Sequence, residues 1–296
     1  EGFNKYEWRW KALNSIGVNL ETSKPEWTPS NKGKILLWAE QGIGDEILFA
    51  SLIPELVGKV DQLIVKVDER LIPLFKRSFD QRIIYINKNN LIDEENYDFH
   101  IAMGSLLKFF RKSKEDFKKG KKKYLKVNER KSTIFRDKLK NLGYKKIIGI
   151  SWKSNSLINK NKSLSLEKFI LGIYSPNVCF VNLQYGDNKT EINNIREKYN
   201  IDIIEFEEVD IYNNIDDLAA LIYACDVVVS IENLLFALAG AIGVKSKILL
   251  TRNCLCFNGS NDLKSYWLPA QDFFRQTSSG EWEKALGQIK NEIATS

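Results

Sequence analysis

The sequence has little of the residues on which several common chemistries depend. It contains a single histidine, His100, among 296 residues. With one histidine, the chain cannot form a metal site that needs two histidine ligands. The absence of a G-x-S-x-G elbow further argues against a Ser-His-Asp hydrolase. The four cysteines include one C-x-C pair, Cys254 and Cys256, but no C-x-x-C. We therefore expect no bound metal and a reducing, cytoplasmic setting.

The sequence also lacks the glycine motifs of the best-known nucleotide-binding proteins. Neither G-x-G-x-x-G nor a glycine loop ending in Gly-Lys-Ser/Thr occurs. This argues against a dehydrogenase or epimerase of the Rossmann type and against a Walker ATPase. No apolar run reaches the length of a membrane span, and no signal-peptide pattern stands at the start. The chain begins with Glu1, not Met, so we expect a fragment or a processed chain.

The composition is that of a globular protein, with 44% hydrophobic and 28% charged residues, and the length suits two domains. The net charge is +6. Lysine and arginine are concentrated between Lys108 and Lys126. Such a run is either a solvated face or a peripheral contact with an anionic surface. No motif that reads DNA or RNA accompanies it, so we expect no nucleic-acid partner.

Strands and helices alternate along the chain in two successive series. The first series runs from a strand at 34–38 to a strand at 98–103. The second runs from a strand at 146–152 to one at 247–250, which we expect to be the last, before a terminal helix at 281–293. Strands that alternate with helices predict parallel sheets.

These series predict an α/β protein of two Rossmann-like parallel-sheet domains that face each other across a cleft. We expect a helical adaptor at 1–32, a first domain at 33–127, a second domain at 128–276 and a C-terminal helix at 277–296. Parallel sheets bind ligands beyond the carboxyl ends of their strands. The loops that follow the strands are therefore the candidate sites.

One loop of the first series combines glycines with a carboxylate. Gln41, Gly42 and Gly44 follow the first strand, and Asp45 stands where a helix begins. Glycine lets the backbone approach a ligand closely, and the first amides of a helix favour an anion. Asp45 is either the N-cap of this helix or a carboxylate at the rim of a cleft that accepts a proton. His100, in a later strand, is a weaker catalytic candidate.

A loop of the second series carries groups that suit a diphosphate. It follows the strand at 146–152 and contains Trp152, Lys153, Lys160 and Lys162. Its amines would supply positive charge and hydrogen bonds together. The alternative is an ordinary lysine-rich surface loop.

Two further positions of the second series lie at the ends of strands. Glu232 and Asn233 stand before an apolar helix, where the helix amides would hold a phosphate and Glu232 would accept from sugar hydroxyls. The alternative is an ordinary N-cap region. Gln184 ends another strand of this series. A cleft between the two halves would collect all of these residues.

The same residues carry a resemblance to a known family. The chain is similar, nearly end to end, to the glycosyltransferase-like region that follows tetratricopeptide repeats in many bacterial proteins. That region is related to the heptosyltransferases of glycosyltransferase family 9, which have the GT-B fold. The most specific match is the glycine loop at 37–45. Further matches lie at 6–10, 97–100, 150–152 and 182–184.

The resemblance implies a transferase of the hexosyl or heptosyl type that takes its sugar from a nucleotide-sugar without a bound metal. The acceptor would be a hydroxyl of a glycan or a protein, and the anomeric centre would invert. In the family the aspartate of the glycine loop is the general base, and Asp45 occupies that place. The loop at 153–163 and the helix start at Glu232 and Asn233 would hold the nucleotide diphosphate.

The chain departs from the family pattern near the expected phosphate site. It has Glu232 and Asn233 where the family usually has Asp-Thr or Asp-Ser, Ala237 where a histidine is usual, and Lys162 where an arginine is frequent. The alternative hypothesis is therefore a catalytically inactive module of the same fold that binds a glycan or protein partner.

Overall fold

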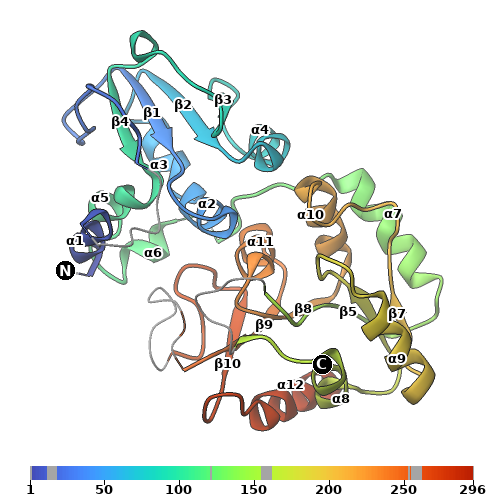
Figure 1. The fold of residues 1–296 in the computed structure, drawn as a ribbon. Coiled ribbons are helices and arrows are strands. Elements are labelled where there is room, and N and C mark those ends of the chain that lie inside the picture. The colour runs from blue at the N-terminus through green and yellow to red at the C-terminus, as the bar shows by residue number, and fades with distance from the viewer. Residues whose placement is uncertain are drawn as a thin grey trace. The chain divides into compact units, whose positions relative to one another are not determined.

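The computed structural model describes residues 2–11, 19–120, 122–154, 162–252, 254 and 262–295. The chain divides into two compact units, residues 1–126 and 127–296, which we call unit 1 and unit 2. Each unit has its own parallel sheet (Figure 1).

Unit 1 is built on a four-stranded parallel sheet in the order β3-β2-β1-β4. The inner strand β1 (Lys34–Trp38) is an almost continuous apolar run, which is typical of a strand covered on both faces. The strands are β1 (Lys34–Trp38), β2 (Gln62–Val67), β3 (Ile84–Asn87) and β4 (Phe99–Ala102). The helices are α1 (Gly2–Tyr6), η1 (Glu7–Trp10), α2 (Ile43–Ala50), α3 (Ile53–Val57), η2 (Glu69–Leu71), α4 (Ile72–Ser78), η3 (Glu94–Asn96), η4 (Met103–Leu106), α5 (Leu107–Phe110) and α6 (Asp116–Lys119).

The strand order of unit 1 reverses beside β1. From β1 the chain adds β2 and then β3 on one side, and it returns to add β4 on the other. The last residue of β1, Trp38, pairs with Ala102, the last residue of β4. The loops after β1 and β4 therefore leave the sheet side by side. A switch point of this kind is where open parallel sheets bind ligands.

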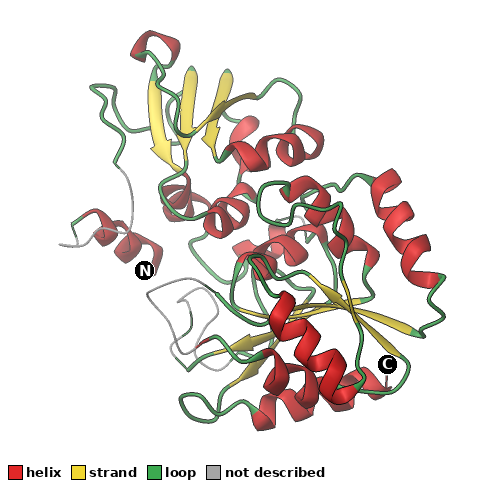
Figure 2. Cartoon of the chain, turned by 45° about the vertical axis from the view of Figure 1, so that its right-hand side comes forward, coloured by secondary structure: helices red, strands yellow, loops and turns green. Residues whose placement is uncertain are grey.

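Unit 2 is built on a six-stranded parallel sheet in the order β10-β9-β8-β5-β6-β7, whose strands lie between helices in Figure 2. The strands are β5 (Lys146–Ser151), β6 (Val178–Asn182), β7 (Ile203–Ile204), β8 (Val227–Ile231), β9 (Ser246–Leu250) and β10 (Gln271–Arg275). The helices are α7 (Glu129–Lys140), α8 (Leu166–Ile173), α9 (Lys189–Tyr199), α10 (Ile215–Ala224), α11 (Leu234–Ile242) and α12 (Glu283–Thr295). The switch point of this sheet lies between β5 and β8.

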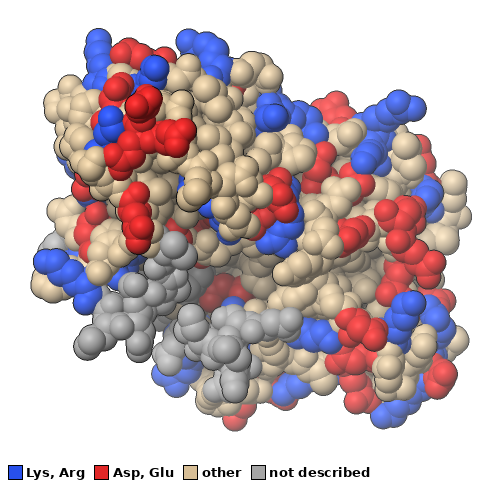
Figure 3. All heavy atoms as spheres, turned by 45° about the horizontal axis from the view of Figure 1, so that its top comes forward, with Lys and Arg blue, Asp and Glu red and all other residues tan. Residues whose placement is uncertain are grey.

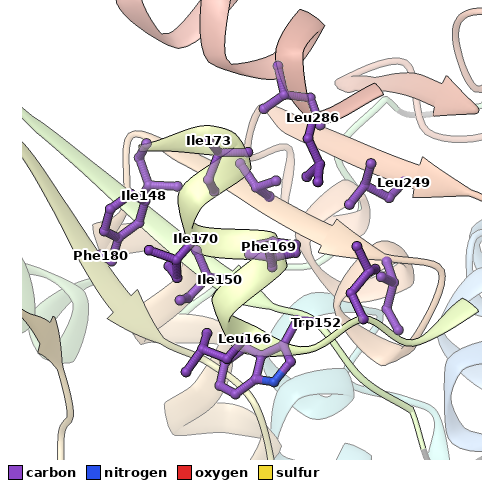
Figure 4. Packing of buried hydrophobic residues seen from close by; sticks show 14 of the residues in the cluster. Ile148, Ile150, Trp152, Leu166, Phe169, Ile170, Ile173, Phe180, Leu249 and Leu286 are labelled. Atoms are coloured by element: carbon purple, nitrogen blue, oxygen red, sulfur yellow. The ribbon is translucent and has the colours of Figure 1, made fainter. Parts of the chain in front are cut away.

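One part of the core of unit 2 lies between its sheet and the helices α8 and α12. Phe169 and Ile170 of α8 pack against Ile150 of β5, with Leu286 of α12 in the same cluster (Figure 4). Burying a side chain of this size stabilises a fold by about 1.5–3 kcal/mol. Gly172 lets α8 approach α12 closely, because a Cβ there would lie 2.7 Å from the Leu286 side chain. The terminal helix is thus part of this core.

Most expected strands and helices occur, with ends displaced by a few residues. Ser165 caps α8, since its side chain accepts from the Lys168 amide. The prediction that the strand at 247–250 is the last one is wrong. β10 pairs in parallel with β9 and forms the edge of the sheet. Its sequence, QDFFR, has too few apolar residues to resemble the buried strands.

The charge excess between Lys108 and Lys126 is partly neutralised within unit 1. Lys108, Arg111 and Lys119 each form salt bridges with carboxylates. On the face shown in Figure 3, basic and acidic side chains are interspersed. Among the described residues, no helix combines the length and the apolar character that crossing a membrane requires.

Candidate functional site

The glycine loop leaves β1 and enters α2 at the switch point of unit 1. Gly42 is the N-cap of α2 in extended conformation. Asp45 is therefore the third helical residue, and its amide donates to the Gly42 carbonyl at 2.9 Å. The interpretation of Asp45 as the N-cap is thus wrong. Its side chain is a half-buried carboxylate in the first turn, where the helix dipole stabilises an anion.

The residue after Asp45 pins α2 to the carboxyl edge of the sheet. Glu46 is 1% exposed, and its carboxylate accepts from the Asp68 amide and from Lys88 Nζ, both at 2.8 Å. Asp68 follows β2 and Lys88 follows β3. Burial raises the pKa of Glu46, and its two donors act against that rise. The ends of β2 and β3 thereby hold the helix that carries Asp45.

A second buried carboxylate, Glu40, bridges the two loops of the switch point. Its Oε1 accepts from the Gly104 amide at 3.0 Å and from Arg9 Nη2 at 3.1 Å. Burial raises the pKa of Glu40 to about 7, although Arg9 and the hydrogen bonds lower it. A Cβ at Gly104 would lie 2.5 Å from Oε1, so the contact requires glycine. The sequence motifs do not single out Arg9, Glu40 and Gly104 as site residues. A charged residue directly after an apolar strand was the available signal.

Gln41 and His100 contact different parts of unit 1. The Gln41 side chain donates to the Tyr6 hydroxyl. Burial raises the pKa of Tyr6, and the charges of Asp45 and Glu40 add to that rise. His100 Nδ1 accepts from Trp38 Nε1 at 3.2 Å, and burial lowers the pKa of the imidazole. His100 lines a pocket of about 320 Å³ together with Glu7, Trp38 and Ser105.

In unit 2, Gln184 organises the strand end at β5. Its Oε1 accepts from Ser151 Oγ at 2.8 Å, from the Trp152 amide at 3.0 Å and from the Lys153 amide at 2.9 Å. Asn233 Nδ2, from the other side of the switch point, donates to Ser151 Oγ at 2.7 Å. The structure therefore brings together four of the predicted positions: Trp152, Lys153, Gln184 and Asn233.

Two of the predicted lysines have polar partners within unit 2, whereas the side chain of Trp152 is buried. Lys153 Nζ contacts a Glu191 carboxylate oxygen at 2.8 Å, and Lys162 Nζ donates to the Glu232 carbonyl at 3.0 Å. Trp152 is fully buried in the core of unit 2, so its backbone and not its ring lies at the strand end. Lys160 lies outside the described residues.

The start of α11 has the features of an N-cap region. Asn233 is the N-cap, and its Oδ1 accepts from the Leu235 amide at 3.0 Å, which confirms that alternative. Glu232 is 5% exposed, and Ala237, within α11, is 1% exposed. A buried methyl group offers no hydrogen bond where the resembled family has a histidine.

A pocket of about 500 Å³ adjoins Gln184 at the ends of β6 and β7. The rings of Tyr185 and Tyr212, which both line it, lie 6.2 Å apart. Asn182 Nδ2 donates to Glu205 Oε1 at 3.2 Å on another wall. The sequence does not reveal this pocket because two separate segments, 182–189 and 205–212, line it. Among the described residues, no group of three or more His, Cys, Asp or Glu side chains could hold a metal ion.

Protein FlbA of Caulobacter vibrioides is 28% identical to this chain over 309 residues, which cover 98% of this chain and 51% of FlbA. The chain thus spans about half the length of this curated relative. No protein-family model matches the chain.

Solved structures of glycosyltransferases share the fold of the chain. Escherichia coli ADP-heptose LPS heptosyltransferase II matches with a TM-score of 0.60 and 13% identity over 88% of this chain and 98% of that one. The glycosyl transferase family 9 protein of Veillonella parvula DSM 2008 matches with a TM-score of 0.57 and 10% identity over 89% and 95%. TibC, described as a heptosyltransferase in complex with ADP-D-beta-D-heptose, matches with a TM-score of 0.53 and 9% identity over 96% and 80%. With its two parallel-sheet units, the chain has a fold of the GT-B type.

Proposed function

We propose that this protein is a glycosyltransferase that moves a hexosyl or heptosyl group from a nucleotide-sugar to a hydroxyl of a glycan or protein acceptor. The reaction inverts the anomeric centre and uses no bound metal. One observation carries the proposal. The chain has the GT-B fold of heptosyltransferases along most of its length, with a carboxylate, Asp45, in the glycine loop at a switch point.

Asp45 is the general base in this proposal. It takes the proton of the acceptor hydroxyl as that oxygen bonds to the anomeric carbon. The bond from this carbon to the diphosphate breaks on the opposite side, which inverts the centre and releases a nucleoside diphosphate. Base catalysis of this kind contributes on the order of 10²–10⁴ in rate. The contacts of Glu46 with the ends of β2 and β3 hold α2, and with it Asp45, in place.

The donor belongs to unit 2 in this proposal. Lys153 and Lys162 would exchange their present partners, a Glu191 carboxylate oxygen and the Glu232 carbonyl, for the diphosphate oxygens and stabilise the leaving charge. Lys160, the third predicted lysine, would add to this charge. Tyr185 and Tyr212, whose rings contact each other, would offer a surface on which the base stacks in the pocket beside Gln184. The Glu205 carboxylate, on another wall of this pocket, would accept hydrogen bonds from the ribose hydroxyls.

One observation favours a second function, that of an inactive binding module. Ala237 is buried without a polar group, and Glu232 places a carboxylate next to the proposed phosphate site. Ala237 weakens an anion site because it lacks the hydrogen-bond donor that a histidine would supply, and the longer Glu232 side chain, in place of the family's aspartate, changes where the negative charge lies. A module of this kind would keep the fold and bind a glycan or protein partner without transfer.

A thermal-shift screen separates the two functions. It covers UDP-, ADP-, GDP- and CMP-sugars and the free nucleotides. A ligand at a hundredfold its Kd stabilises by about 2.7 kcal/mol. A shift with one nucleotide class supports the transferase and names its donor, whereas no shift in a folded protein supports the module.

Turnover of the selected donor then tests the base. Asp45→Asn should lower transfer or donor hydrolysis on the order of 10²–10⁴-fold with the donor shift unchanged. The matched control is Asp93→Asn, an exposed aspartate of unit 1. Equal rates in the two variants would refute the role of Asp45. An NMR assignment of the product anomer tests inversion, and activity in excess EDTA tests metal independence.

A further inference from the structure

The N-terminal segment, residues 2–10, contacts both loops of the unit 1 switch point through one side chain. Arg9 Nη2 donates to Glu40 Oε1 at 3.1 Å and to Ser105 Oγ at 2.8 Å. Glu40 follows β1, and Ser105 follows β4. The segment therefore lies at the place where the sheet is built to bind a ligand, not beside it.

Arg9 is itself held in one orientation. Its guanidinium carbon lies 4.4 Å from the ring centre of Tyr6 and 4.3 Å from that of Trp10. Its Nη1 donates to Glu7 at 2.6 Å, and the side chain is 12% exposed. A planar guanidinium between two rings loses little further freedom when it forms hydrogen bonds. The arrangement is thus a rigid brace.

A second contact reaches the next residue of the glycine loop. Gln41 donates to the Tyr6 hydroxyl, so that two successive loop residues, Glu40 and Gln41, are held by the same segment. They directly precede Gly42, where the chain turns into α2. Glycine leaves the backbone free to adopt many conformations, so these contacts fix the loop side of the helix start, while those of Glu46 hold the helix itself.

We propose that Arg9 is a positioning residue, which holds the glycine loop so that Asp45 meets the acceptor hydroxyl. The N-terminal segment is then a working part of the acceptor-side site and not a linker that leads into it. This inference rests on the proposed role of Asp45. Without Arg9, Glu40 loses its cation in a buried place, and the loop relaxes away from its present course.

The kinetic test compares Arg9→Met, Arg9→Lys and Lys11→Met. Lys11 is an exposed cation directly after this segment that stacks on Trp8, so its loss makes the same charge change away from the loop. Arg9→Met should lower kcat at least tenfold, with the donor KM unchanged because the donor binds unit 2. Arg9→Lys should restore part of the rate. Rates per folded molecule that are equal in Arg9→Met and Lys11→Met would overturn the proposal.

A second measurement needs no turnover. Amide hydrogen exchange at residues 41–47 should quicken at least tenfold in Arg9→Met and stay unchanged in Lys11→Met, at equal exchange in the β2 amides. Unchanged exchange in Arg9→Met would overturn the proposal that Arg9 holds the glycine loop in place. If the wild type shows no transfer that depends on Asp45, the proposed function fails, while the exchange result still decides whether Arg9 positions the loop.

Discussion

Replacing Glu40 by glutamine should change how the stability of unit 1 depends on pH. Burial raises the pKa of Glu40 from 4.5 to about 7 in the folded protein. Between these values the folded state binds more protons than the unfolded state. The contribution of Glu40 to stability is therefore fully present below pH 4.5 and is lost as the pH rises through 7. Glutamine carries no proton that titrates, so Glu40→Gln should lack this loss.

The two pKa values set the size of the effect. Each unit of difference between the folded and unfolded pKa corresponds to about 1.4 kcal/mol of folding free energy. The complete loss of stability is therefore about 3 kcal/mol. At pH 5 the unfolded carboxyl is already partly ionised. The loss between pH 5 and pH 8 is therefore about 2–3 kcal/mol. Other groups, Glu46 among them, titrate in both proteins and cancel when the wild type is compared with the variant.

The assay is the free energy of unfolding of unit 1 at pH 5 and pH 8, from amide exchange of β1 in increasing urea. Relative to the wild type, Glu40→Gln should gain about 2–3 kcal/mol from pH 5 to pH 8. Glu95→Gln, which removes an exposed carboxylate of the same unit, should show no such gain. A difference between wild type and Glu40→Gln that stays constant with pH would refute the reasoning.

Two further substitutions test the packing of the candidate sites by urea unfolding. Gly104→Ala forces a Cβ to within 2.5 Å of Glu40 Oε1 and should destabilise unit 1 by about 1–3 kcal/mol. The control Gly287→Ala, in α12 with nothing within 4 Å of the added Cβ, should stabilise unit 2 by about 0.5–1 kcal/mol. Gln184→Leu leaves three donors without their acceptor and should cost unit 2 about 3 kcal/mol, at about 1 kcal/mol each. Gln288→Leu, at an exposed glutamine, should cost less than 0.5 kcal/mol.

The candidate residues differ in how far the sequence reveals them. Asp45 lies in the first helical turn after the loop that follows β1, and Gln184 lies two residues after β6. The apolar pattern predicts both strands, and the rule for parallel sheets then marks both positions. The alternatives left open at Asp45 and Asn233 needed the structure. Both are short polar residues near a helix start, and the choice depends on which residue has non-helical backbone.

The sequence by itself determined the two series of strands and helices, and with them the two parallel-sheet units, because apolar runs and helical spacing are properties of neighbouring residues. It did not reveal β10, whose place at a sheet edge depends on β9 and not on its own apolar content. Only the tertiary structure decided the contacts of Arg9, since Glu40 and Ser105 lie 31 and 96 residues away in the chain. The raised pKa of Glu40 has the same origin, because a carboxylate is buried by what packs around it and not by its neighbours in sequence.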